Sequence, residues 1–422
     1  FLGYISYIVT GWLLLCLPFT MYTGVSTLDN LFIATSAVST TGLATTSVSG
    51  SYTFAGQFLI MALIQLGGIG YMTFSSFVIL AQKKTLSGKR SEISEAVFSL
   101  PKTFVVEKFI RSVIIFTFVI ELAGAAALYP IFRTAGVETP LWSAIFHSVS
   151  SFCTAGFGLY DNSFECFTDN FWLNFIVAVL SYLGAVGFIV CVDVYRRLTA
   201  KTDCMTLTSR IILWTTFWMT VTGTAVIFLS ETSISAMPPY ERLMAAFFQA
   251  MSAMTTVGFN SVGIGALSQA TLMLLTILMV IGASPSGTGG GLKTTTFSAF
   301  LGLMRSTIIG RKEVTFWGKP IPEERIQTAV ASLGFYLACL LIGAFILTLT
   351  EPQAFEKILF EAASALGTVG LSTGITSSLT VLGKIIVILL MFVGRLGPLS
   401  FGMALTFRPN ASERDSDNDL AV

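Results

Sequence analysis

The sequence is poor in charge, in histidine and in paired cysteines. Only 11% of its 422 residues are charged and one is histidine, whereas a soluble domain carries about 25% charged residues. The net charge of +1 gives no basis for binding nucleic acid. The six cysteines form no CxxC pair and no metal-ligand spacing, so we expect small buried side chains and predict no disulfide between Cys153 and Cys166. No nucleophile–base arrangement is present, and we expect no enzyme.

Apolar residues are abundant instead. They make up 54% of the chain, with 36 phenylalanines and a mean hydropathy of +0.79. A helix needs about 20 apolar residues to cross a bilayer, and the chain offers eight such runs, at 1–23, 54–82, 108–132, 170–195, 207–230, 268–304, 326–350 and 379–406. The first run lacks a basic leader and a cleavage site, so it is typical of a spanning helix. The sequence predicts an all-α integral membrane protein that crosses the bilayer several times.

Two kinds of connection alternate between these runs. Most lysines and arginines lie in the connections 83–111, 196–210 and 305–325 and in the tail after 407. The positive-inside rule places these segments, and the C-terminus, in the cytoplasm. The opposite connections are acidic, which would raise the local concentration of cations or provide an ordinary solvated surface. Their acidic residues are Asp29, Glu138, Asp161, Glu165, Asp169, Glu241, Glu351, Glu356 and Glu361.

Each outer connection contains the same motif. The four copies read FIATSAVSTTGL (32–43), FHSVSSFCTAGF (146–157), FQAMSAMTTVGF (248–259) and FEAASALGTVGL (360–371). All four share Phe at the first position, Ser at the fifth, Thr at the ninth and Gly at the eleventh. The glycines recur roughly every 105 residues, which indicates a fourfold internal repeat.

The motif suits a segment that enters the membrane without crossing it. The stretch before each glycine is too short to span and is predicted to be a short helix dipping in from outside. Irregular backbone at membrane depth is tolerated where it is buried in protein or lines a water-filled path. Four such segments around one axis can offer carbonyl oxygens to a dehydrated ion, and glycine permits the backbone conformation that this requires. We expect four helix–pore helix–helix repeats in a pseudo-fourfold arrangement around a central pore.

The Thr-Val-Gly steps at 256–258 and 368–370 resemble the selectivity filter of potassium channels. Four linked, non-identical copies resemble the Trk/Ktr/HKT superfamily of potassium transporters. The stretches PEER (322–325) and GRLGPLSF (394–401) make the chain most similar to the membrane subunit of bacterial Ktr systems. This resemblance implies a potassium filter with potassium bound at Gly42, Gly156, Gly258 and Gly370. The filter residues would be Thr40, Thr41, Gly42, Thr154, Ala155, Gly156, Thr256, Val257, Gly258, Thr368, Val369 and Gly370.

The resemblance implies further properties that the residues alone do not show. It implies potassium uptake across the bacterial cytoplasmic membrane, sodium dependence, and K⁺ (with Na⁺) as the transported ion without an organic cofactor. It also implies a homodimer in the lipid bilayer and a cytosolic nucleotide-binding ring of the RCK type docked on the basic loops. The predicted units are 1–103, 104–205, 206–320 and 321–408, followed by a cytoplasmic tail at 409–422.

The sixth apolar run is interrupted by GASPSGTGGGLKTTT (282–296). Glycines and a proline within a span break the helix and are typical of a transport pathway. The resemblance implies that this loop gates conduction below the filter. The predicted gate comprises Gly282, Ser284, Pro285, Ser286, Gly287, Thr288, Gly289, Gly290, Gly291, Lys293 and Arg395.

Within that set the two cations have different predicted roles. Arg395 lies inside the eighth run, at the same distance after its motif glycine as the loop start is after Gly258. A charge within a span is costly, by ~3 kcal/mol, so we expect Arg395 to hydrogen-bond the loop and to form an electrostatic barrier. Lys293, at the end of the loop, is interpreted as an anchor that faces the cytoplasm, with a contact to the loop as the alternative.

Three other readings of the sequence were weighed. The string GTGGGLKT (287–294) lacks the adjacent Gly-Lys of a phosphate-binding loop, which argues against ATP. Glycines 67, 68, 70, 184 and 187 are interpreted as helix-packing positions, and His147, Gln249 and Glu361, at the second motif position, as buttresses of the pore helix. An alternating-access cation symporter, which also uses broken helices, is the alternative function.

Overall fold

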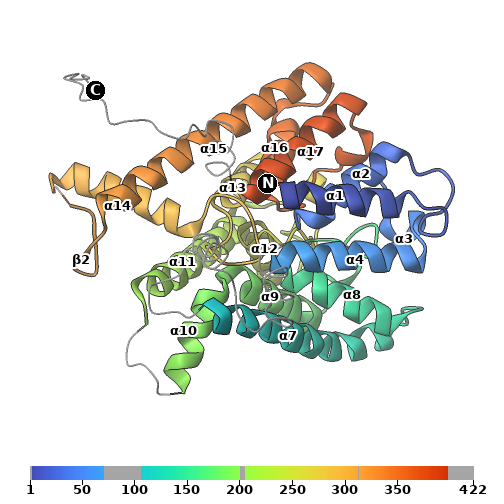
Figure 1. The fold of residues 1–422 in the computed structure, drawn as a ribbon, viewed down its shortest axis with the longest axis horizontal. Helices are drawn as coiled ribbons and strands as arrows, with labels where there is room; N and C mark the ends of the chain where they lie inside the picture. Colours follow the sequence, from blue (N-terminus) through green and yellow to red (C-terminus); the bar gives the residue numbers. More distant parts are fainter. Residues whose placement is uncertain (1, 71–105, 200–204, 312, 398–422) are drawn as a thin grey trace.

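The computed structural model describes residues 2–70, 106–199, 205–311 and 313–397 (Figure 1). The expected helical membrane fold is confirmed. Much of the first basic connection, the tail at 409–422 and the ends of the second and eighth predicted spans, 71–82 and 398–406, lie outside the described residues.

Four helices carry the motif, and each lies between two apolar helices in the chain. The motif helices are α2 (Thr27–Val38), α8 (Pro140–Phe152), α12 (Pro239–Thr255) and α16 (Phe355–Gly367). They have 12 to 17 residues, too few to cross a bilayer. Their starts follow helix-capping rules: Ser26 accepts a hydrogen bond from Asp29 N, and α8 and α12 begin with proline.

The helices before each motif are α1 (Leu2–Leu15), α7 (Val106–Thr134), α11 (Leu207–Ser230) and α15 (Glu323–Thr350). Within the described residues, Ile110–Thr134, Leu207–Ser230 and Glu323–Thr350 are each long and apolar enough to cross a membrane. Large apolar side chains on these helices are exposed, among them Leu122, Trp214 and Leu349. In a bilayer these side chains would face lipid.

The helices after each motif are α4 (Phe54–Ile69), α9 (Phe171–Val186), α13 (Gln269–Ile281) and α17 (Val381–Leu396). Each ends at a glycine with positive φ: Gly70, Gly187, Gly282 and Gly397. The helices in the apolar runs 54–82, 170–195 and 379–406 therefore end before the runs do, because a glycine in the left-handed region ends a helix. After Gly187 the chain continues as α10 (Phe188–Leu198), bent by 99° from α9.

The remaining elements complete the connections. They are α3 (Val48–Ser51), η1 (Glu165–Phe167), η2 (Ile264–Ala266), η3 (Thr376–Ser378), α14 (Thr294–Ile309) and the antiparallel strands β1 (Thr315–Phe316) and β2 (Lys319–Pro320). Figure 1 shows α14 and α15 extending away from the body of the molecule, with β2 beside the far end of α14. Almost every motif residue is buried.

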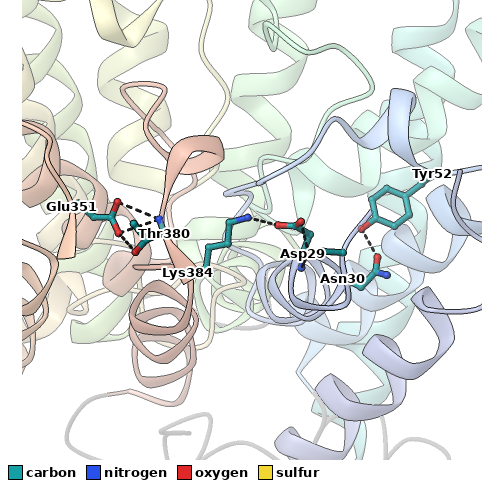
Figure 2. A network of polar contacts seen from close by, with 7 residues as sticks. Asp29, Asn30, Tyr52, Glu351, Thr380 and Lys384 are labelled. Carbon is teal, nitrogen blue, oxygen red and sulfur yellow. Dashed lines mark hydrogen bonds and ion pairs between the residues drawn. The ribbon is translucent and has the colours of Figure 1, made fainter. Parts of the chain in front are cut away.

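Charged side chains tie the first and last parts of the chain together. Lys384 of α17 forms an ion pair with Asp29 of α2 at 2.7 Å, the one ion pair among the residues that the structure describes. Beside it, the Glu351 carboxylate accepts hydrogen bonds from the backbone N–H and hydroxyl of Thr380, which precedes α17 (Figure 2). These contacts bring the first motif helix beside the last helix of the fold.

Candidate functional site: a ring of four glycine turns above a glycine loop

Each motif helix ends in a turn with the same backbone conformation. We call residues 40–42, 154–156, 256–258 and 368–370 the motif turns. The threonine that opens each turn has φ between 48° and 60°, and the glycine that closes it has φ between 63° and 97°. A positive φ is uncommon for threonine and readily adopted by glycine. The repeated threonine and glycine therefore mark one backbone shape that occurs four times.

The four turns form a closed ring. A Cβ atom on Gly42 would lie 2.4 Å from Ala155 O, and one on Gly156 would lie 2.5 Å from Val257 O. A Cβ on Gly258 would lie 2.0 Å from Val369 O, and one on Gly370 would lie 2.2 Å from Thr41 O. Each glycine thus packs against a carbonyl of the next turn, and no larger residue fits without moving backbone.

The serine at the fifth motif position supports each turn from behind. The backbone N–H before each motif glycine donates to the carbonyl of this serine, for example Thr41 N to Ser36 O at 2.8 Å and Val369 N to Ser364 O at 2.9 Å. In the first and fourth copies the hydroxyls of Ser36 and Ser364 also accept from the glycine N–H, at 3.1 and 3.0 Å. The hydroxyl bonds account for serine in these two copies, whereas the hydroxyls of Ser150 and Ser252 have no partner among the described residues.

The polar residue at the second motif position holds the chain that follows the turn. His147 Nε2 accepts from Leu159 N at 3.2 Å while Nδ1 donates to Ser143 O at 2.7 Å. Glu361 accepts hydrogen bonds from the hydroxyls of Ser372 and Thr376. Gln249 faces Ser261. These side chains thus hold the segment that follows each motif turn against the motif helix.

A hollow of about 350 Å³ lies over one face of the ring. All four motif glycines line it, together with Asp161 and Glu165. Of the other acidic residues named from the sequence, Glu351 caps α17 and Glu361 is buried behind the fourth turn. Acidity at the ring therefore comes from a single connection, the one after the second motif.

The glycine loop (282–293) runs beneath the ring. It begins at Gly282, the residue that ends α13, and stops where α14 starts at Thr294, three residues short of the predicted end at 296. Its first half is hydrogen-bonded to the break between α9 and α10. Ser284 N donates to Ala185 O at 3.0 Å, and Ser286 O and Oγ accept from the first two N–H groups of α10, Phe188 N at 3.2 Å and Ile189 N at 3.3 Å.

Close backbone contacts shape the same part of the loop. A Cβ on Gly187 would lie 2.6 Å from Pro285 O, and one on Gly287 would lie 2.6 Å from Ala185 O. Gly282 and Gly291 have positive φ and pack against each other, with a Cβ on Gly291 only 2.9 Å from Gly282 Cα. A side chain at any of these positions would force the loop backbone away from its contacts.

The top of the loop contacts the threonines of all four motif turns. The Thr288 hydroxyl lies 3.1 Å from Thr154 Oγ1, and the Thr40 hydroxyl donates to Thr288 O at 3.3 Å. A Cβ on Gly289 would lie 2.3 Å from Thr256 Oγ1, and one on Gly290 would lie 2.1 Å from Thr368 Oγ1. Three consecutive loop residues therefore fill the space below the ring.

Two cations hold the carbonyls of this part of the loop. The Arg395 guanidinium donates to Thr288 O and Gly67 O and, at 2.9 Å, to Thr40 Oγ1. Lys293 Nζ donates to Gly289 O at 2.8 Å. Of the two interpretations of Lys293, the structure shows the loop contact and not the cytoplasm-facing anchor, because the flexible side chain folds back and satisfies a loop carbonyl.

The glycines interpreted as packing positions have two separate roles. A Cβ on Gly67, Gly184 or Gly394 would lie within 2.2 Å of a carbonyl at the end of a motif helix, so these glycines do allow close helix packing. Gly70 and Gly187 instead end their helices, and Gly187 also contacts the glycine loop. Their regular placement after each motif glycine was the signal in the sequence.

Known proteins are similar to this chain over nearly its whole length. Residues 17–414 match the TrkH family, described as cation transport proteins. The chain is 32% identical to Ktr system potassium uptake protein B of Bacillus subtilis over 99% of this chain and 95% of that protein. It is 35% identical to the potassium/sodium uptake protein NtpJ of Enterococcus hirae, covering 97% and 93% of the two chains.

The crystal structure of the potassium transporter TrkH from Vibrio parahaemolyticus has the same fold. It matches with a TM-score of 0.73 at 21% identity and covers 96% of this chain and 83% of the transporter. The family match spans both the motif turns and the glycine loop. The chain therefore belongs to the TrkH family of cation transport proteins.

Proposed function

We propose that this protein takes up potassium through the ring of motif turns and that the glycine loop gates the path below it. The observation that carries the proposal is the closed ring of four glycines, each against a carbonyl of the next turn, with loop residues 288–290 directly beneath. Backbone carbonyls in such a ring can replace the water shell of a dehydrated cation.

The electrostatics of the ring favour a cation. All four motif helices end at the ring, so their negative C-terminal ends point toward it. Asp161 and Glu165 add carboxylates to the hollow above. Arg395 lies on the opposite side, where its charge would oppose cation passage while it holds the loop.

Replacing one ring glycine tests the filter. Gly258→Ser places a side chain against Val369 O, and we expect the preference for potassium over sodium in proteoliposome uptake to fall about tenfold. Gly136→Ser is the matched control, because Gly136 also has positive φ but a Cβ added there would have no neighbour within 4 Å. An unchanged potassium affinity in Gly258→Ser would exclude the ring as the filter.

An alternating-access symporter is the second candidate. The observation in its favour is the interruption of all four helices that follow the motifs. A symporter predicts saturable flux at low turnover with fixed ion stoichiometry, whereas a gated pore predicts flux that follows the electrochemical gradient. Flux measured at several membrane potentials decides between them.

The wider assembly forms part of the same proposal. The relatives are named as components of a Ktr system and as a potassium/sodium uptake protein, which supports a partner subunit and sodium dependence. We propose a homodimer with a cytosolic nucleotide-binding ring of the RCK type on the basic loops, in the bacterial cytoplasmic membrane with the C-terminus inside. Potassium uptake titrated with sodium, with and without the ring subunit and its nucleotide, tests both dependences.

A further inference from the structure

A carboxylate lies in the middle of a membrane-spanning helix, outside the ring and the loop. Glu121 belongs to the apolar stretch Ile110–Thr134 of α7 and is only 5% exposed. The one ion pair among the described residues does not involve it. An ionisable residue at this depth costs about 3 kcal/mol or more and marks a functional position by default.

Three helices meet at this carboxylate. Gln65 Nε2 of α4 donates to Glu121 Oε2 at 3.0 Å. The Cys153 thiol, which follows α8, lies 3.6 Å from Glu121 Oε1 and 3.7 Å from Gln65 Oε1. The Ser148 hydroxyl of α8 donates to the backbone carbonyl of Glu121 at 2.6 Å. Glu121 therefore joins α7 to α4 and to the end of the second motif helix.

Cys153 connects this cluster to the ring. It is the residue directly before the second motif turn, and its carbonyl accepts a hydrogen bond from Thr154 Oγ1 at 2.8 Å. Its thiol is tightly enclosed, since a Cβ on Gly68 would lie 2.5 Å from Cys153 Sγ. A shift of Cys153 would therefore move Thr154 and the carbonyls that follow it.

The other three motifs have no such connection among the described residues. At the position of Cys153, the Ser39 hydroxyl pairs with Thr41 Oγ1 at 2.6 Å, and Thr255 Oγ1 donates to Met251 O at 2.7 Å. The fourth motif has Gly367 there. Among the described residues, only the second turn is preceded by a residue that side chains from two other helices contact.

We propose that Glu121 is a positioning residue that, through Gln65 and Cys153, fixes the second motif turn and thereby sets the discrimination between potassium and sodium. The inference rests on the proposed function and deepens it. Losing the carboxylate leaves the Gln65 amide without its acceptor in an apolar interior, where an unpaired polar group is costly. The end of α8 would then settle into a different position.

Two readouts test the role. The first is the rise in melting temperature of the detergent-purified protein in KCl compared with NaCl, which reports ion binding without transport. The second is the ratio of potassium to sodium uptake in proteoliposomes. We expect Glu121→Leu to lower the uptake ratio at least fivefold and to shrink the KCl-specific rise in melting temperature.

The matched variants separate positioning from general damage. Glu121→Gln keeps an oxygen acceptor for Gln65 and should stay within twofold of the parent. Thr117→Val removes a buried hydroxyl without a partner one turn earlier on α7 and should leave the selectivity unchanged. If Glu121→Leu does not fold, Gln65→Leu removes the other half of the contact and should lower the ratio in the same way.

The outcomes are distinguishable from failure of the proposed function. A parent protein that shows neither potassium-specific stabilisation nor potassium uptake would overturn the proposed function itself. A selective parent whose Glu121→Leu or Gln65→Leu variant is equally selective would overturn the role of Glu121, as would an equal loss in Thr117→Val.

Discussion

The two halves of the ring are supported differently from below. In the half formed by the first and second motif turns, the hydroxyls of Thr40 and Thr154 are hydrogen-bonded to Arg395 and Thr288. In the half formed by the third and fourth, the hydroxyls of Thr256 and Thr368 have no partner among the described residues and face only Gly289 and Gly290. A nearly symmetric ring thus lies on an asymmetric loop.

The units also differ in how the end of the helix before each motif is connected to the start of the helix after it. In the third and fourth units a glutamate at the end of the first of these helices accepts hydrogen bonds from the residue that caps the second, Glu231 from Ser268 and Glu351 from Thr380. In the first unit the acceptors are backbone carbonyls instead, because Thr53 N donates to Thr20 O and the Thr53 hydroxyl donates to Phe19 O. We call these helix-to-helix contacts the outer frame. Because the hydroxyls of Thr256 and Thr368 have no partner among the described residues, we expect the loop to leave the ring first at Gly289 and Gly290.

The largest effect is expected from Arg395→Gln, which removes the guanidinium from the hydrogen-bonded half. A hydrogen bond to a charged group contributes about 1.5–3 kcal/mol, so the closed arrangement should weaken by about tenfold or more. Rubidium flux through proteoliposomes should rise accordingly. Arg242→Gln is the control. Arg242 also donates to a backbone carbonyl, but its acceptor is Phe228 O and not a carbonyl of the loop. Equal flux in both variants would show that Arg395 does not hold the loop closed.

A smaller effect is expected from Thr288→Val in the same half. The substitution removes the hydroxyl contacts to Phe152 O at 3.0 Å and Thr154 Oγ1 at 3.1 Å while keeping the shape of the side chain. At about 1 kcal/mol for a neutral hydrogen bond, flux should rise roughly fivefold. Thr288→Ser retains the hydroxyl and should behave as the parent; a rise in the serine variant would place the effect in packing instead.

Gly290→Ala probes the glycine half, and we expect a rise of about two- to threefold. The new methyl group would meet Thr368 Oγ1 and Gly367 O, but the Thr368 hydroxyl has no hydrogen bond among the described residues that the methyl group could break. Gly334→Ala is the control, because a Cβ there has no neighbour within 4 Å. If Gly290→Ala opened the path as far as Arg395→Gln does, the two halves would be equally firm and the comparison would fail.

The outer frame gives the smallest effect, seen in stability as a function of pH. Burial opposes ionisation of Glu231, but hydrogen bonds from Thr271, Ser233 and Ser268 outweigh it and lower its pKa to about 2. A carboxyl with a lowered pKa in the folded state stabilises above its ordinary pKa, near 4.5, and loses that contribution as the pH falls toward 2. The difference in melting temperature between the parent and Glu231→Gln should therefore be largest near pH 6 and shrink below pH 4. A difference independent of pH would show that Glu231 acts through shape alone.

The ring positions and the loop could be predicted from sequence because each has a local signature. A motif that recurs four times identifies the turns without knowledge of their contacts, and a cluster of glycines around Pro285 cannot continue a helix. Gly70 and Gly187 recur at similar distances after their motif glycines, but that pattern is equally compatible with close helix packing, since a glycine in an apolar helix is tolerated. Their effect depends on a positive φ that only the folded chain reveals.

Contacts between distant segments were beyond the sequence for a different reason. The pairing of Glu121 with Gln65 depends on side-chain direction and on which helices become neighbours. Composition shows only that a charge within an apolar run needs a partner. The sequence therefore predicted that Arg395 hydrogen-bonds the loop, where its acceptor is Thr288 O, while Gly67 O and Thr40 Oγ1 followed only from the packing of α4, α17 and the first motif turn.

The contacts around the ring all run in one rotational sense, from each turn to the next along the chain and from the fourth back to the first. The ring is therefore handed. A side chain added at Gly156 would press on Val257 in the turn ahead and leave Thr41 in the turn behind untouched. Because one polypeptide encodes all four turns, each can vary separately, and the aperture can be displaced from its centre by a single substitution.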